Sequence, residues 1–321
     1  MAIPAWHEAI TGFDVLAVAL IVGAVAARLV WLHGARGDRQ REQMLLRRLN
    51  ALFAALLGLL TLTSVAMLFA RTIAISGMPF PQVAGAVPLV LRETDFGKVW
   101  LARAAAVLLM WLLWMSMAMR RRRQAWLLAI LVGVVAFSRS ATGHAGDHGD
   151  FAWPVWIDWL HLISAGLWGG AIVTFVLAVR PVLRQHSQQN DLAAAIVKRY
   201  SMLAAAGFGL AVATGIYNAC QRVGGWQPLL TTRYGLILDA KLVLVAAMAI
   251  LGATNRFRHV PAVLAAARSG DPRSLLRTLR GLSLTSIAEA VLWLAIIVAV
   301  ALLLSGVPPS SLPAASAVVP R

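Results

Sequence analysis

Long apolar blocks alternate with short polar or basic connections along the whole chain. Apolar runs of about 18 residues or more with few charges are typical of helices that cross a bilayer. The fourth block is short for a span unless it continues to Thr142. The pattern predicts an all-α fold, a polytopic transmembrane helical bundle of about eight spans, over Phe13–Leu32, Leu49–Ala70, Val99–Met119, Ala125–Phe137, Val155–Val179, Ser201–Cys220, Leu236–Thr254 and Thr285–Ser305.

The connection over 71–98 contains Pro79, Pro81 and Pro88, and proline interrupts the backbone hydrogen bonds of a helix. We therefore expect a short interfacial or re-entrant helix there rather than another span. The first apolar block follows no basic segment, so we expect a span and not a cleaved secretory signal. A single transmembrane domain is predicted over 1–306, followed by a Pro-, Ser- and Ala-rich tail over 307–321 that is expected to be disordered.

Basic residues are concentrated in alternate connections. Of the 29 Lys and Arg, 19 lie in the connections after spans one, three, five and seven, and only seven lie in the other connections and the C-terminal tail. By the positive-inside rule, both termini and the connection between spans four and five are predicted to face the periplasm. Membrane topology and contact with anionic lipid also explain the net charge of +16, so we expect no nucleic-acid partner.

The stretch Ser138–Gly170 holds the densest group of potential ligands. Asp158 and His161 are three residues apart and share a helix face, so we expect the carboxylate to orient the imidazole for metal binding. His144 and His148 are four apart, and one helical turn would point both rings the same way. Three of the seven histidines and three carboxylates lie in this stretch: His144, Asp147, His148, Asp150, Asp158 and His161. We predict a metal site built on its histidines.

The choice of metal and the rest of its ligand shell stay open at this point. Imidazole binds copper, zinc, iron and nickel, while a thioether favours Cu(I). Met78 and His7 lie on the predicted outer side and are candidates to complete the shell, although His7 alone is equally well explained as an interfacial residue. The main alternative is a b-type haem electron-transfer protein, with His161 and either His7 or His144 as axial ligands. A copper chaperone that does not transport would share the same site.

Further ionisable residues are predicted within spans, where a charge marks a functional site or a satisfied ion pair. Asp239 and Lys241 are interpreted either as a structural pair, satisfied by Arg103 or Asp14, or as part of an ion path. Glu289, near the predicted cytoplasmic side, is the candidate for the exit of such a path. No Walker loop, GxSxG or HExxH motif occurs, so neither enzymatic activity nor ATP-driven transport is expected.

Several segments together resemble one known family. They are TGHA at Thr142–Ala145, DWLHLISAGLWGG at Asp158–Gly170, YGLILDAKLVL at Tyr234–Leu244 with the following ATNRF, and AEAVLWLAIIVAVALLLSGVPP at Ala288–Pro309. In order and spacing they are similar to the copper-resistance D family (CopD/PcoD) of bacterial inner-membrane proteins, over essentially the whole chain.

The resemblance implies a multi-pass protein of the bacterial inner membrane that handles copper ions at the periplasmic face and passes copper to the cytoplasm. It also implies partnership with a periplasmic CopC-like copper carrier, which is expected to be a separate protein because the sequence contains no such domain. The family motifs carry over to His144 and His161, and more loosely to Asp158, Lys241 and Glu289. His148 and His7 are candidates from local chemistry alone.

Overall fold

The computed structural model describes residues 5–31, 39–116, 122–143, 145–146, 149, 151–185, 190–305 and 309–311. Within these ranges every regular element is helical and no strand occurs. The α-helices are α1 (Ala5–Trp31), α2 (Arg39–Ser76), α3 (Val87–Glu93), α4 (Asp95–Met115), α5 (Arg122–Ala141), α6 (Trp153–Ala165), α7 (Ala171–Thr174), α8 (Arg180–Gln185), α9 (Asn190–Val223), α10 (Trp226–Thr231), α11 (Arg233–Thr254), α12 (Val260–Ser269) and α13 (Pro272–Ser305). Three π-helical turns cover Gly166–Gly170, Phe175–Val179 and Asn255–His259, and 3-10 turns cover Val83–Gly85 and Pro309–Ser311.

Eight helical segments in the described ranges are long and apolar enough to cross a membrane, which confirms the predicted all-α bundle. The fourth reaches Ala141 and is therefore a full span. The proline-rich connection between α2 and α4 forms only a 3-10 turn and α3, as predicted. The segments are Ala9–Val30, Glu42–Ser76, Asp95–Met115, Arg123–Ala141, Trp153–Arg184, Asp191–Val223, Arg233–Ser269 and Pro272–Leu304.

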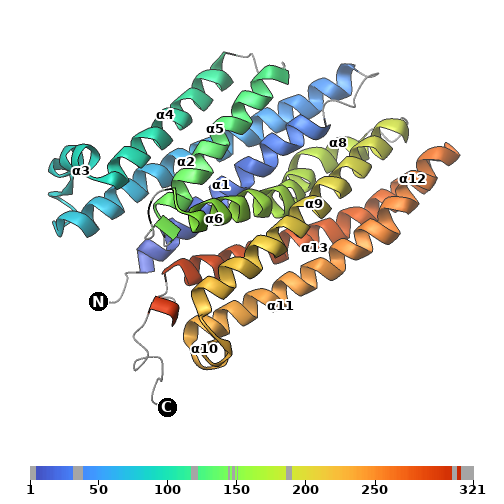
Figure 1. Ribbon diagram of the computed structural model, residues 1–321. Helices are drawn as coiled ribbons and strands as arrows, with labels where there is room; N and C mark the ends of the chain where they lie inside the picture. Colours follow the sequence, from blue (N-terminus) through green and yellow to red (C-terminus); the bar gives the residue numbers. More distant parts are fainter. Residues whose placement is uncertain are drawn as a thin grey trace.

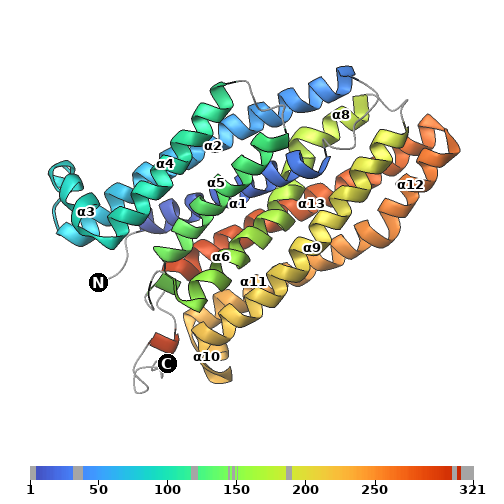
Figure 2. The same ribbon diagram turned by 45° about the horizontal axis from the view of Figure 1, so that its top comes forward.

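The first helix lies in the middle of the bundle (Figure 1), packed against α2, α5, α13 and the π turn at 166–170. Ala17, Val18 and Ile21 on α1 are completely buried. In both views, α2, α3 and α4 form one flank, and α9, α11, α12 and α13 form the other (Figure 2). The N-terminal and C-terminal halves of the chain therefore lie on either side of α1.

Glycines let α1 approach the fifth span closely. A Cβ placed on Gly23 would lie 2.1 Å from the carbonyl carbon of Gly170, and one on Gly166 would lie 2.7 Å from Cβ of Val22. Small residues at helix contacts allow backbones to approach in membrane bundles, where van der Waals packing drives association. This contact fixes the position of the fifth span, which carries His161, against the central helix.

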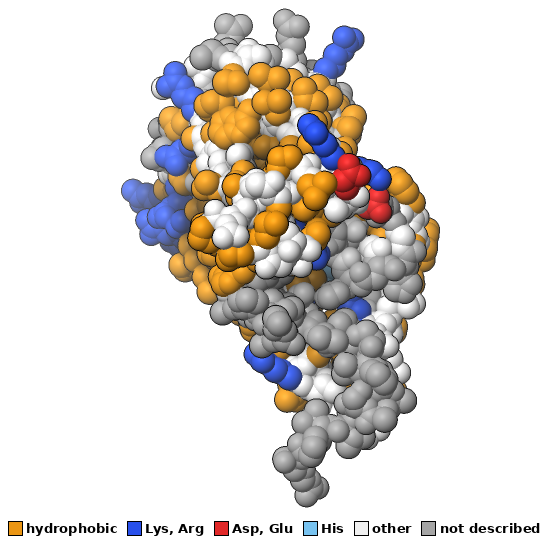
Figure 3. Space-filling model, turned by 90° about the vertical axis from the view of Figure 1, so that its left-hand side faces the viewer, with side chains coloured by type: hydrophobic (Ala, Val, Ile, Leu, Met, Phe, Trp, Pro, Cys, Tyr) orange, Lys and Arg blue, Asp and Glu red, His pale blue; other side chains and the backbone are white. Residues whose placement is uncertain are grey.

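The outer surface of the bundle is largely hydrophobic. Side chains such as Leu62, Phe80 and Val243 are about 70% exposed, and Figure 3 shows hydrophobic side chains over much of the face on the side of α3. Soluble monomers rarely expose apolar patches of this extent. Together with the eight spans, this surface makes the chain a multi-pass membrane protein.

The two ends of the bundle carry different connections. The start of α1, the end of α13, α3, α10 and the connection from α5 to α6 lie at one end, which we call the α10 end. The opposite end carries α12, the end of α8 and the start of α9, and we call it the α12 end (Figure 1). The region predicted to bind metal therefore lies toward the α10 end.

Candidate functional site

His161 faces α9 from the second half of α6. Its Nδ1 atom lies 3.0 Å from the Thr214 hydroxyl oxygen, and that hydroxyl donates its own proton to the backbone oxygen of Leu210 at 2.7 Å. When the Thr214 proton is used there, Nδ1 donates and Thr214 accepts. The ring also has a backbone hydrogen bond to Ala211, and in the tautomer with the proton on Nδ1 the lone pair is on Nε2. A fixed tautomer of this kind is what a metal-binding histidine needs.

Gly215 makes room for the His161 ring. A Cβ at this position would lie 3.1 Å from Cε1 and 3.6 Å from Nδ1 of the imidazole, closer than ordinary van der Waals contact to the first atom. A side chain at 215 would therefore require the imidazole ring to shift by a few tenths of an ångström. The sequence ATGIYN in α9 therefore supplies both the hydrogen-bond partner and the space.

Asp158, predicted to orient His161, interacts with it electrostatically but makes no hydrogen bond to its ring among the described residues. Its carboxylate accepts a hydrogen bond from Arg222 at 2.8 Å and a longer one from Asn218 at 3.4 Å. Both predicted residues do face α9, where Thr214, Asn218 and Arg222 form a stripe at four-residue spacing. Asp158 lies one turn nearer the start of α6, so it reaches the end of the stripe and leaves Thr214 to His161.

The structure describes the surroundings of only some of the other predicted ligands. His144 and His148 lie outside the described residues, and His7 lies on α1 with a side chain that is also outside them. Met78 is 42% exposed in the connection between α2 and α3. Within the part of the chain that the structure describes, no three His, Cys, Asp or Glu side chains gather closely enough to hold a metal ion. Of the predicted ligands, only His161 has a described protein environment built around it.

Asp239 and Lys241 make no ion pair within 4 Å among the described residues. Lys241 interacts electrostatically with Asp158 and His161 over a longer distance, so it lies in the neighbourhood of the candidate site. Arg103 and Asp14, the partners considered for this pair in one of the two interpretations, bind each other.

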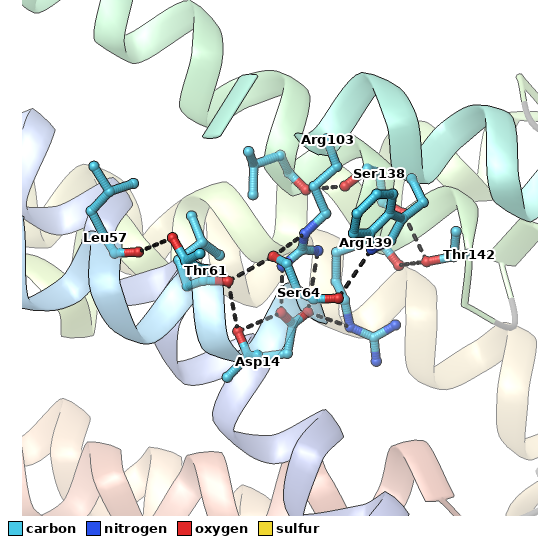
Figure 4. Close-up of polar contacts among 12 residues, drawn as sticks. Asp14, Leu57, Thr61, Ser64, Arg103, Ser138, Arg139 and Thr142 are labelled. Atoms are coloured by element: carbon cyan, nitrogen blue, oxygen red, sulfur yellow. Dashed lines mark hydrogen bonds and ion pairs between the residues drawn. The ribbon is translucent and has the colours of Figure 1, made fainter. Parts of the chain in front are cut away.

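Asp14 is the centre of a buried polar cluster that the sequence did not reveal (Figure 4). The carboxylate is fully buried on α1 and forms a close ion pair with Arg103 of α4, whose Nη1 also lies 3.3 Å from Oδ2. Arg139 of α5 approaches the same carboxylate, with Nε 3.6 Å from Oδ2. From α2, the Thr63 hydroxyl donates to Asp14 at 3.0 Å, and Ser64 accepts from Arg103 at 2.9 Å. The cluster joins four helices.

This cluster holds more positive than negative charge. One carboxylate faces two guanidinium groups, both less than 10% exposed. A charge removed from water is tolerated only when a partner of opposite charge compensates it. Both arginines can therefore be buried only because Asp14 is present. The surplus charge makes the cluster a poor binding place for a metal cation.

A second buried cluster surrounds Glu289 on α13. Its Oε2 accepts a hydrogen bond from Asn255 at 2.5 Å and lies 3.5 Å from the hydroxyl of Tyr200 on α9. Tyr200 is also 3.2 Å from the Ser286 hydroxyl. Counting along α9 at 100° per residue, Tyr200 and Thr214 lie on nearly the same face, about 21 Å apart. The surroundings of His161 and of Glu289 are thus connected along one side of α9.

Two family profiles match this chain, one in its N-terminal half and one in its C-terminal half. The sequence profile described as "Copper resistance protein D-like, N-terminal domain" matches residues 9–153, and the profile described as "Copper resistance protein D" matches residues 194–304. No solved structure matches the chain.

Two characterised relatives are similar over most of this chain. A copper resistance protein D of Pseudomonas syringae pv. tomato is 31% identical over 277 residues, which cover 84% of this chain and 88% of the relative. The copper transport protein CutJ of Bacillus subtilis (strain 168) is 28% identical over 247 residues, which cover 74% of this chain but 44% of that protein. These relatives are named for copper resistance and transport and not for an enzymatic reaction. The chain belongs to the copper resistance protein D family.

Proposed function

We propose that this protein binds copper at the α10 end and moves it toward the cytoplasm. His161 holds the ion through Nε2, together with His144 and His148, and His7 or Met78 completes the shell. The observation that carries this proposal is the contact between His161 and Thr214, which favours the tautomer with its lone pair on Nε2 when the Thr214 proton goes to Leu210. Imidazole nitrogen is a good copper ligand, and the names of both relatives refer to copper.

The α10 end is assigned to the periplasm of a bacterial inner membrane. The support for this is the distribution of Lys and Arg, which are few in the connections at that end and many in those at the α12 end. Copper arrives there from a separate periplasmic carrier of the CopC type. Such a carrier transfers the ion by exchange between ligands, which requires donor groups near the surface such as those of the α5–α6 connection.

The copper route runs along α9 and avoids the Asp14 cluster. The surplus positive charge of Arg103 and Arg139 repels a cation. On the other side of α1, Asp158, Asp239 and Lys241 set the electrostatic field near the entrance, and the polar groups around Glu289 line the inner part. Between the two lies a close contact, where a Cβ on Gly207 would be 2.7 Å from the backbone nitrogen of Trp168. The fifth span and α9 must separate there for an ion to pass.

Replacing His161 with alanine is expected to abolish stoichiometric copper binding by the purified protein, because no second ligand in the described bundle can replace the lost nitrogen. Elemental analysis of detergent-purified protein measures this directly. His259→Ala is the matched control, since it removes an imidazole near the α12 end and should leave the copper content unchanged. Copper retained by His161→Ala contradicts the site, and a Soret band in the wild-type visible spectrum points to the haem alternative instead.

Replacing Thr214 with valine is expected to weaken copper binding by about 10- to 100-fold, as does the loss of other groups that orient a metal-binding histidine. Valine keeps the shape of threonine but cannot accept the Nδ1 proton. Thr214→Ser retains the hydroxyl and should bind copper like the wild type. Competition with a coloured copper chelator gives the affinities. Equal affinities for the valine and serine variants would mean that the tautomer of His161 plays no part.

A further inference from the structure

Glu289 lies in the interior of the bundle with only neutral groups around its carboxyl. The residue is 2% exposed. Its Oε2 receives the amide hydrogen of Asn255 at 2.5 Å and faces the Tyr200 hydroxyl at 3.5 Å. Its Oε1 faces Gly252, where a Cβ would lie 3.2 Å away, so the absence of a side chain at 252 leaves space for this oxygen.

Asn255 also contacts a second residue of α13, the helix that carries Glu289. The Thr285 hydroxyl donates to the side-chain oxygen of Asn255 in a close contact. In this arrangement the amide nitrogen of Asn255 points to Glu289. Asn255 opens the π turn Asn255–His259, and π turns are rare and frequently occur at functional sites. The carboxyl group thus has a preorganised polar cradle from α9, the π turn and α13.

No cation compensates Glu289 within the described residues. Three arginines on neighbouring elements donate elsewhere: Arg256 to Ser201, Arg199 to the backbone oxygen of Val30, and Arg28 to Asn50. His259 lies beside Gly281, about two turns before Glu289. Lys198, Arg258 and Arg268 are exposed, and Asp239 and Lys241 lie toward the opposite end of α11. Tyr200 is the titratable group that faces the carboxyl.

Asp14 and Glu289 are both buried acids, but they differ in their charged partners. Asp14 has two guanidinium partners and is compensated as an anion. An ionised carboxylate without a charged partner is strongly disfavoured in such surroundings, and the group becomes neutral by binding a proton. The Ser286 and Tyr200 hydroxyls can donate or accept, so the cradle can accommodate both forms of the acid.

We propose that Glu289, held by Asn255, Tyr200 and Ser286, is a proton-binding site inside the membrane that takes up and releases one H⁺. This adds a second ligand to the proposed copper function and does not depend on it. A proton that binds and leaves at this position gives the bundle a means to respond to the proton gradient across the membrane. The site is built from α9, the π turn and α13, the elements on the side of the bundle that we assign to the copper route.

The test is infrared difference spectroscopy of copper-free protein, treated with chelator, between neutral and alkaline pH. We expect the wild type to show the carbonyl stretch of a protonated carboxylic acid at neutral pH, which disappears at alkaline pH. Glu289→Gln should lose this band while remaining folded, because the amide oxygen can still accept from Asn255. Glu93→Gln on the exposed face of α3 is the control and should retain the band.

Reaction with dicyclohexylcarbodiimide gives an independent measurement, because this apolar reagent modifies protonated carboxyl groups in membranes. Peptide mass spectrometry should find the adduct on Glu289 and not on the ion-paired Asp14. A wild type without the acid band at neutral pH, or a Glu289→Gln variant with the band undiminished, would falsify the proposal. Since no copper is present, neither result bears on copper binding at His161.

Discussion

Replacement of Asp14 by alanine is expected to lower the free energy of unfolding by about 3–5 kcal/mol, because it leaves two guanidinium groups buried without a carboxylate. Thr63 would also lose its hydrogen bond to Asp14 and would keep only the backbone oxygen of Leu60 as an acceptor. Loss of this size removes a large part of the stability of a typical protein. Thermal unfolding in detergent, followed by tryptophan fluorescence and by the monodisperse fraction in size-exclusion chromatography, measures the effect.

Two controls separate this effect from the loss of any carboxylate. Asp95→Ala removes an exposed acid that pairs with Lys98 at 2.8 Å and should leave the unfolding temperature nearly unchanged. A triple variant with Asp14→Leu, Arg103→Met and Arg139→Met removes all three charges together and should recover most of the lost stability. An Asp14→Ala protein that unfolds at the wild-type temperature would show that the two arginines reach water or lipid headgroups.

Replacement of Gly23 by alanine is expected to destabilise the bundle by about 1–3 kcal/mol or more. This is the usual cost of overpacking a core. The added methyl group would lie 2.1 Å from the carbonyl carbon of Gly170 and 2.5 Å from the nitrogen of Ala171. These are backbone atoms, so no side chain can rotate away and the two helices must separate. The same thermal measurement reports the loss.

Gly58→Ala on α2 is the matched control. A Cβ there would meet no atom within 4 Å, and alanine is favoured over glycine within a helix by roughly 0.5–1 kcal/mol. The control should therefore unfold at the wild-type temperature or above it. If both variants lose stability equally, the cause is not the contact between α1 and the fifth span.

Hydropathy predicted the spans well because their length and composition are properties of single segments. The three-residue spacing between Asp158 and His161 also indicated correctly that they share a helix face. Their partners could not be predicted in the same way. Thr214 and Arg222 belong to another helix, and hydropathy does not indicate how two helices are rotated against each other.

The Asp14 cluster illustrates the same limit. Its members come from four helices, and Arg139 was assigned by sequence to a connection outside the membrane. The structure places Arg139 within α5, which extends to Ala141. The sequence did contain one signal. The predicted fourth span was too short, and extending it to full length would bring Arg139 into the bundle, where a buried arginine needs an acidic partner.

The π turn at Asn255–His259 has a consequence for the geometry of the seventh span. A π turn contains one residue more than the α-helical pattern allows, so it shifts every later side chain by about 100° around the helix axis. The two parts of this span, α11 and α12, therefore present faces that no single helical wheel describes. The side chains of α12 that face lipid therefore do not continue the lipid-facing stripe of α11. A one-residue deletion within the turn would rotate α12 relative to α11 without changing the sequence of either helix.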